Sequence, residues 1–265
     1  MSGFETIRVA VDEAGTARLT LARPAKHNAL SAATIAELTR AAQDLGADDT
    51  VRAVVLSGEG RSFCAGADLA WMREQFDAPR AARLDQAMAL ARMLRSLNEL
   101  PKPLIGRING QAFGGGLGLI AVCDVALAAD SARFAFTETA LGLIPATISP
   151  FVLARMGEGA ARRVFFSARA FDATEGVALG LFAKAVPGDG LDAAVAAELA
   201  PYRRTAPAAV ARAKALARSG GPVIDDAVLA RTAALLADAW EDGEARARIG
   251  RFLDRAAAKG SAEQG

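Results

Sequence analysis

The chain has 265 residues, of which 52% are apolar and 23% charged, so it is long enough and apolar enough to bury a sizeable core. Its 31 lysine and arginine residues nearly balance 30 acidic residues, and a net charge of +1 gives no overall field that would draw it to nucleic acid or to an anionic membrane. Residues 1–12 lack a secretory-signal pattern and no apolar run has membrane-spanning length, so we expect a cytoplasmic protein.

Short β-rich runs alternate with helical patterns in the first half of the chain. In order, the sequence predicts strands at 7–11 and 17–21, a helix that begins at Ser31, a strand at 53–57, a helix at 79–99 and a strand at 104–108. This alternation favours parallel strands joined by crossovers, which is the α/β class.

The second half of the chain is predicted to be mostly helical after a short β-rich run at 133–136. Asp172 and Glu175 have the spacing of a capping box, in which each side chain accepts a hydrogen bond from the backbone amide of the other residue. Alanine and arginine at helical spacing predict a helical lobe near the C-terminus, and we expect residues 260–265 to fray.

Cysteine and histidine are both scarce. Cys64 and Cys123 are too few and too far apart in sequence for a disulfide framework, so we expect both to be reduced. His27 is the only histidine, and any zinc site or Ser-His-Asp triad would have to be built on it alone. Acid–base chemistry is therefore predicted to depend mainly on carboxylates.

The first segment that suggests chemistry is Phe63-Cys-Ala-Gly-Ala-Asp-Leu69, directly after a β run and a glycine-bearing turn. Its small residues would let backbone amides approach a ligand closely. The alternative interpretation is a tight strand-to-helix turn in which Asp68 caps the helix.

The second segment is glycine-rich, Asn109-Gly-Gln-Ala-Phe-Gly-Gly-Gly-Leu-Gly118, between a strand and an apolar run. Glycines at a helix start leave amides exposed to an anion, which suits an oxyanion hole. Gly116, Gly118 and Ala121 also match the G-x-G-x-x-G/A dinucleotide fingerprint, with Glu138 downstream, so a nicotinamide-dependent oxidoreductase is an alternative.

The third segment places one acid, Glu138, in the otherwise apolar stretch 136–145. Burial would raise the pKa of this carboxyl and suit it to proton transfer near neutral pH. The alternative is a structural carboxylate that caps the next helix.

Together the three segments resemble the enoyl-CoA hydratase/isomerase (crotonase) family in order and spacing. Residues 23–30, Arg-Pro-Ala-Lys-His-Asn-Ala-Leu, are similar to that family's R-P-x-x-x-N-A-L segment, and residues 252–255 are similar to its C-terminal F-L-E-K. Residues 66–72 and 142–151 are most similar to bacterial methylglutaconyl-CoA and isohexenylglutaconyl-CoA hydratases.

The resemblance implies a crotonase-like α/β fold with a core of stacked ββα units in residues 1–195 and a C-terminal helical lobe in 196–265. That lobe would close the site and build a homotrimer or a dimer of trimers. The ligand would be an acyl-CoA thioester, so that coenzyme A is part of the substrate and no separate cofactor or metal is needed.

The resemblance also implies roles for individual residues. The amides of Ala67 and Gly115 would form the oxyanion hole for the thioester carbonyl, and Glu138 would be the acid/base. Contacts with coenzyme A would come from Lys26, Ala65, Ala67, Asp68, Leu69, Gly115 and Arg255.

One departure from the family pattern affects the reaction. Typical hydratases of the family carry two glutamates that hold and activate water, and Gly118 stands at the place of the first. Glu138 could act alone, the distal carboxylate of a glutaconyl-type substrate could replace the missing glutamate, or the enzyme could shift a double bond instead of adding water. The leading expectation is reversible hydration of a branched 2-enoyl-CoA; a noncatalytic acyl-CoA-binding protein is a further alternative. We also expect the 76–83 loop to shape the acyl pocket.

Overall fold

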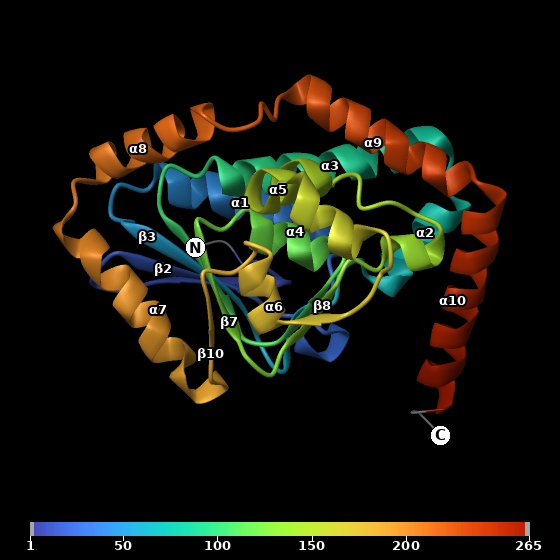
Figure 1. Cartoon of the computed structure of the whole chain (residues 1–265), viewed down its shortest axis with the longest axis horizontal. Helices are drawn as coiled ribbons and strands as arrows, with labels where there is room; N and C mark the ends of the chain where they lie inside the picture. Colours follow the sequence, from blue (N-terminus) through green and yellow to red (C-terminus); the bar gives the residue numbers. More distant parts are fainter. Residues whose placement is uncertain (1–2, 263–265) are drawn as a thin grey trace.

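The computed structural model describes residues 3–262, with side chains up to residue 258, and contains two β-sheets covered by helices (Figure 1). In Figure 1 helices α1, α3, α4 and α5 form a layer across one side of the strands, and α10 stands at one edge of the molecule. The α/β class expected from the alternation of strands and helices is confirmed.

The larger sheet has six strands. Their order is β1 (Ile7–Val11), β2 (Thr16–Leu21), β3 (Ala53–Gly58), β5 (Leu104–Ile108), β7 (Val125–Ala129) and β10 (Lys184–Val186). The first two strands form an antiparallel hairpin, and every later neighbour pairs in parallel. All six residues of β3 are buried, as is typical of a parallel strand covered on both faces.

The smaller sheet has four short strands. Their order is β4 (Ser62–Cys64), β6 (Gln111–Phe113), β8 (Arg133–Ala135) and β9 (Phe171–Asp172). The first three run parallel, so their carboxyl ends meet at one edge, whereas β9 is antiparallel to β8. The segment that follows each of these three ends is one of the three singled out from the sequence.

The described chain contains ten α-helices and four short 3-10 helices. The α-helices are α1 (Ala32–Ala47), α2 (Leu69–Asp77), α3 (Arg80–Asn98), α4 (Gly115–Ala121), α5 (Ser149–Phe165), α6 (Ala173–Ala178), α7 (Leu191–Leu199), α8 (Pro207–Ser219), α9 (Asp226–Glu241) and α10 (Gly243–Ala262). The 3-10 helices are η1 (Pro24–Lys26), η2 (Glu138–Leu141), η3 (Gly188–Gly190) and η4 (Ala200–Arg204).

Local side-chain chemistry sets several helix starts. Ser31 caps α1 by accepting a hydrogen bond of 3.2 Å from the amide of Thr34, as the sequence predicted. Only half of the expected capping box at α6 is present. Asp172 accepts from the amide of Glu175, but the Glu175 carboxylate pairs with Arg169 at 2.6 Å instead of reaching back. A guanidinium within reach is the stronger partner for a carboxylate.

The C-terminal helices fold back onto the rest of the chain. Six buried side chains form a second small core that joins α10 and α9 to α2 and to the segment after η2: Met72, Leu143, Trp240, Ala245, Ile249 and Leu253. The helix α10 continues through residue 262, and residues 263–265 of the segment expected to fray lie outside the described part of the chain, so fraying stays a prediction. The division at residue 195 stays a prediction.

Both cysteines are free and buried, and burial raises the pKa of each thiol to about 12. Between residues 3 and 262, no helix combines the length and apolar character needed to cross a bilayer.

A glycine at residue 142 allows α10 to pack closely. Gly142 has φ of +76°, and a Cβ there would lie 2.7 Å from the Cα of Ala245 on α10, whereas Gly180 has φ of +78° and its Cβ would have no neighbour closer than 3.6 Å. We expect both alanine variants to lose about 1–2 kcal/mol from the left-handed backbone. Gly142→Ala should lose a further 1–3 kcal/mol, roughly, from overpacking against α10. Urea unfolding measures both, and equal losses would contradict this packing.

Candidate active site

Three neighbouring parallel strands deliver the candidate site residues to one place. The end of β4 leads into Ala67, the end of β6 into Gly115, and the end of β8 into Glu138. Cys64 pairs with Ala112 in the ladder between β4 and β6, so these ends lie side by side. All three predicted catalytic residues line one cavity of about 160 Å³.

The amide of Ala67 is free to bind a ligand. Ala67 forms an isolated parallel bridge with Leu30, in which Leu30 donates to Gly66 at 2.7 Å and Asp68 donates to Leu30 at 2.9 Å. That pattern uses the carbonyl of Gly66 and the amide of Asp68, and it leaves the N–H of Ala67 without a hydrogen bond among the described residues.

The amide of Gly115 is the second free donor. Gly115 is the first residue of α4, so its N–H has no partner within the helix. This N–H also donates no hydrogen bond to any other group in the described structure. The preceding Gly114 has φ of +48° and ψ of −118°, a conformation that requires glycine. A Cβ on Gly66 would lie 2.7 Å from the carbonyl oxygen of Phe113 and 3.7 Å from the Gly115 nitrogen, so the two amide-bearing segments are in close contact.

Glu138 faces these amides from the start of η2. Its Oε1 lies 3.3 Å from the position of a Cβ on Gly114, the residue before the free amide of Gly115. The residue as a whole is partly exposed, but its Oε2 is buried and has no hydrogen-bond partner among the described residues. Burial raises the pKa of the Glu138 carboxyl to about 7, against a smaller opposing effect of its own backbone amide.

The helix-cap interpretation of Glu138 is not supported, because η2 has no side-chain cap. The cap interpretation at residue 68 is confirmed instead. Asp68 accepts from the amides of Ala70 and Trp71 and forms an ion pair of 2.8 Å with Arg23. Although burial alone would raise it, these bonds hold the pKa of Asp68 below its ordinary value. The segment 63–69 therefore serves as both a capped turn and a carrier of a free amide.

The remaining walls of the cavity are almost entirely apolar. Glu138 is the only ionisable side chain among the lining residues, and the large apolar ones are Leu30, Ile35, Trp71, Met72, Leu90, Leu141, Leu143, Ile144, Ile148, Leu236, Trp240 and Phe252. The resemblance pointed to Trp71 and Met72 and implied that the C-terminal lobe would close the site, and α9 and α10 do contribute lining residues, but the sequence did not show which side chains these would be. A thioester with an apolar acyl chain matches such walls.

The structure also explains what replaces the absent glutamate at residue 118. A Cβ on Gly118 would lie 2.6 Å from Cγ2 of Ile148 and 3.3 Å from Cδ1 of Leu94, so the space beside Gly118 is already filled. A Cβ on Gly116 would lie 2.5 Å from the carbonyl oxygen of Cys64. Both glycines of the dinucleotide fingerprint therefore serve packing inside the protein, and the fingerprint gives no support for a pyrophosphate site.

The predicted coenzyme A contacts divide into two groups. Ala65, Ala67 and Gly115 line the cavity. The other four do not: Lys26 and Arg255 are exposed, Leu69 is 46% exposed, and Asp68 is occupied by Arg23. Their contacts with coenzyme A stay predictions.

Residues 76–83, expected to be a loop that shapes the acyl pocket, do not line the cavity, and only 78 and 79 lie outside helices, between the end of α2 and the start of α3. Arg83 is buried and donates to the carbonyls of Gln75 and Phe76 and to the carboxylate of Glu241. The bond to Glu241 connects this segment to α9. The contacts of one arginine therefore fix a segment that was expected to shape the acyl pocket.

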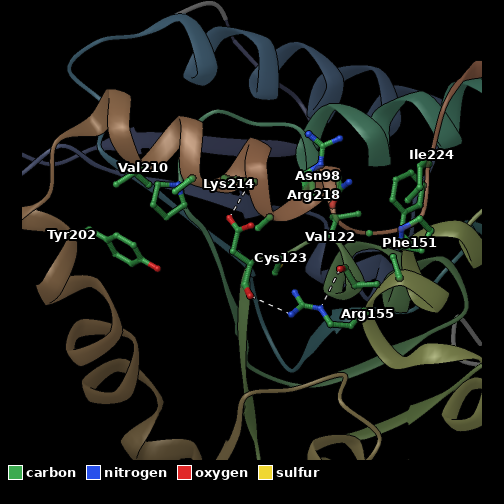
Figure 2. A pocket seen from close by; sticks show the side chains of 18 residues that line it. Asn98, Val122, Cys123, Phe151, Arg155, Tyr202, Val210, Lys214, Arg218 and Ile224 are labelled. Carbon is green, nitrogen blue, oxygen red and sulfur yellow. Dashed lines mark hydrogen bonds and ion pairs between the residues drawn. The ribbon is translucent and has the colours of Figure 1, made fainter.

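A larger cavity of about 540 Å³ lies elsewhere, between α8 and the body of the protein (Figure 2). Its cationic groups are occupied: Figure 2 shows Lys214 paired with Asp124 at 2.8 Å and Arg155 donating to the carbonyl oxygens of Ala121 and Asp124. The third, Arg218, pairs with Glu99 at 2.7 Å. The contacts of Lys214 and Arg155 fasten α8 and α5 to the start of β7. No free amide pair or unpartnered carboxyl comparable with those beside Glu138 lines it in the described structure.

Comparison with known proteins gives one consistent family. Residues 12–255 match the family Enoyl-CoA hydratase/isomerase. The enoyl-CoA hydratase ACTT6 of Alternaria alternata is 36% identical over 218 residues, which are 82% of this chain and 70% of that protein. A crystal structure of an enoyl-CoA hydratase from Shewanella pealeana has a TM-score of 0.79 at 34% identity, covering 95% of this chain and 94% of the other. One from Mycobacterium avium has a TM-score of 0.80 at 32% identity, covering 94% and 96%.

The raised pKa of Glu138 makes a prediction about stability. A carboxyl whose pKa rises from 4.5 to about 7 on folding favours the folded state fully below its unfolded pKa. That contribution is lost as the pH rises through 7, and the shift corresponds to roughly 3 kcal/mol. We expect Glu138→Gln to match the wild type at about pH 4 and to be more stable by about 3 kcal/mol at about pH 8.

Urea unfolding across this pH range measures the difference. The exposed Glu158, which pairs with Arg162 at 3.4 Å, provides the matched control Glu158→Gln. A stability difference for Glu138→Gln that does not change with pH would show that its pKa is not raised.

Proposed function

Because the chain belongs to the enoyl-CoA hydratase/isomerase family, we propose that it catalyses the reversible addition of water to a 2-enoyl-CoA thioester. The observation that carries the proposal is the placement of two free backbone amides and one buried carboxyl of raised pKa in a single apolar cavity.

In this proposal the amides of Ala67 and Gly115 bind the thioester carbonyl oxygen. Negative charge grows on that oxygen as the enolate forms, so two fixed donors stabilise the transition state more than the ground state. The apolar walls exclude water and strengthen both hydrogen bonds. Loss of one such donor typically costs about 3–4 kcal/mol in the transition state.

Glu138 carries the proton. Its ionised carboxylate accepts a proton from water while the water oxygen bonds to C3, and the electrons of the C2–C3 double bond move into the enolate. The same carboxyl then donates that proton to C2, and the thioester carbonyl reforms. A pKa of about 7 makes both the accepting and the donating form accessible near neutral pH.

A branched, 3-methylglutaconyl-like acyl group is the finer part of the proposal, suggested by the sequence of residues 66–72 and 142–151. The apolar walls around Trp71 and Trp240 support a branched chain. Its distal carboxylate would meet no cationic side chain among the lining residues, and burial of an unpaired carboxylate is costly. In this proposal the distal carboxylate therefore lies at the water-facing mouth of the cavity.

A second candidate function is favoured by the contact between Gly118 and Ile148. That contact leaves Glu138 as the only carboxylate of the cavity. A single base suffices to remove a proton from C2 and return it to C4, which is double-bond isomerisation without water. The same amides would hold the same enolate.

Assembly and the coenzyme A contacts complete the proposal. A homotrimer or a dimer of trimers stays a prediction, and the large apolar side chains left exposed, such as Phe166 at 69% and Leu216 at 74%, are compatible with it. The protein would use coenzyme A only as part of its substrate.

The proposed reaction can be tested with purified wild type, Glu138→Gln and the exposed control Glu158→Gln. Three substrates separate branching from charge: crotonyl-CoA, 3-methylcrotonyl-CoA and 3-methylglutaconyl-CoA. We expect a product heavier by one water, a loss of about 10²- to 10⁴-fold in Glu138→Gln, and wild-type rates in the control. Absorbance of the enoyl thioester and mass spectrometry of the product are the measurements.

Each other result has a defined meaning. A product of unchanged mass with a moved double bond would replace hydration by isomerisation. Equal rates for 3-methylcrotonyl-CoA and 3-methylglutaconyl-CoA would remove any role for the distal carboxylate. Binding of all three thioesters without turnover would contradict an enzyme and favour a noncatalytic acyl-CoA-binding protein.

A further inference from the structure

Two unpartnered polar atoms share the candidate active-site cavity. Three buried side-chain oxygen or nitrogen atoms have no hydrogen-bond partner in the described part of the chain, and they belong to Gln75, Glu138 and Thr147. Glu138 and Thr147 both line the 160 Å³ cavity, whereas Gln75 does not. The unpaired atoms in the cavity are Oε2 of Glu138 and Oγ1 of Thr147.

The position of Thr147 connects it to the absent glutamate. Thr147 is 3% exposed and immediately precedes Ile148, whose side chain fills the space beside Gly118. Gly118 lies one helical turn after Gly114 on α4, and Gly114 is the residue next to the Glu138 carboxyl. Thr147 is thus the chain neighbour of Ile148, the residue whose side chain excludes a carboxylate at position 118.

An unpaired buried hydroxyl is unfavourable for folding, and a valine would occupy the same shape without an unsatisfied polar atom. Packing alone therefore does not account for threonine at residue 147. A buried polar site with more than one partner is the setting in which proteins hold a water molecule.

We propose that Thr147 and Glu138 together bind the water molecule that adds to C3, with the Thr147 hydroxyl replacing the carboxylate that Gly118 cannot supply. This assignment rests on the proposed hydratase function. Glu138 Oε2 accepts one O–H of the water and takes its proton in the reaction. Thr147 Oγ1 accepts the other O–H, which remains on the oxygen, and the free lone pair faces C3. Thr147 neither gains nor loses a proton over the cycle.

If Thr147 positions the water, hydration and C2 proton exchange depend on different residues of the site. Removal and return of a C2 proton in a saturated thioester requires Glu138 and the two amides but no added water. Hydration requires all of these and a positioned water. Loss of the Thr147 hydroxyl should therefore reduce hydration and leave C2 proton exchange intact, a split that general damage to the site would not produce.

The experiment compares wild type with Thr147→Val, Thr147→Ser and Thr139→Val. Thr139 donates from its hydroxyl to the carbonyl of Phe165 at 3.1 Å and does not line the cavity, so it is the structural control. Hydration of crotonyl-CoA, deuterium exchange at C2 of butyryl-CoA in D₂O and urea unfolding are measured for each protein.

We expect Thr147→Val to hydrate about 10- to 100-fold more slowly, to exchange C2 protons at close to the wild-type rate and to be no less stable. Thr147→Ser should retain most of the hydration, because it keeps a hydroxyl. Thr139→Val should lose stability without changing the ratio of hydration to exchange.

Two results would overturn the assignment while leaving the hydratase proposal in place: wild-type hydration by Thr147→Val, or an equal fall of hydration and exchange in that variant. A wild-type protein that exchanges C2 protons but hydrates none of the thioesters would instead overturn the proposed function, and this water site with it.

Discussion

Desolvation of the Glu138 carboxyl is the constraint on which the candidate site depends. An ionised carboxylate in an apolar cavity lacks hydration, so the neutral form is favoured and the pKa rises to about 7. No cation offsets this effect, because Glu138 is the only ionisable side chain among the residues that line the cavity. The fold therefore holds an energetically unfavourable group in place through the packing of its surroundings, as is common where proton transfer is the function.

The backbone supplies the complementary part of the site. Three parallel strands of the smaller sheet end at one edge, which places a free amide from each of two segments next to the segment that carries the carboxyl. Close approach of the first two segments requires glycine at Gly66, and the positive φ of Gly114 requires glycine before the second amide. On the far side, Ile148 packs against Gly118 and excludes a second carboxylate. The same cavity thus favours chemistry at an enolate and limits it to one proton-carrying group.

Much of this arrangement could be predicted from the sequence, because it depends on local signals. The strand ends, the Asp68 cap and the isolated acid at Glu138 each depend on about ten consecutive residues. The family match at residues 12–255 confirms the resemblance to the enoyl-CoA hydratase/isomerase family. Contacts between residues far apart in the chain could not be predicted from the sequence. The packing of Ile148 on Gly118, the return of Trp240 to the cavity and the preference of Glu175 for Arg169 all depend on tertiary structure. The strands β9 and β10 have two and three residues, too few to show a periodic pattern.

Titration of the Glu138 carboxyl measures whether it is desolvated in the folded protein. Carbon-13 NMR of protein labelled at glutamate side-chain carboxyls follows each group with pH, and the signal missing from Glu138→Gln identifies residue 138. We expect a midpoint near pH 7, well above the ordinary glutamate value of 4.5. A midpoint near that ordinary value would show a solvated carboxyl and would contradict the desolvated acid/base on which the proposed chemistry depends.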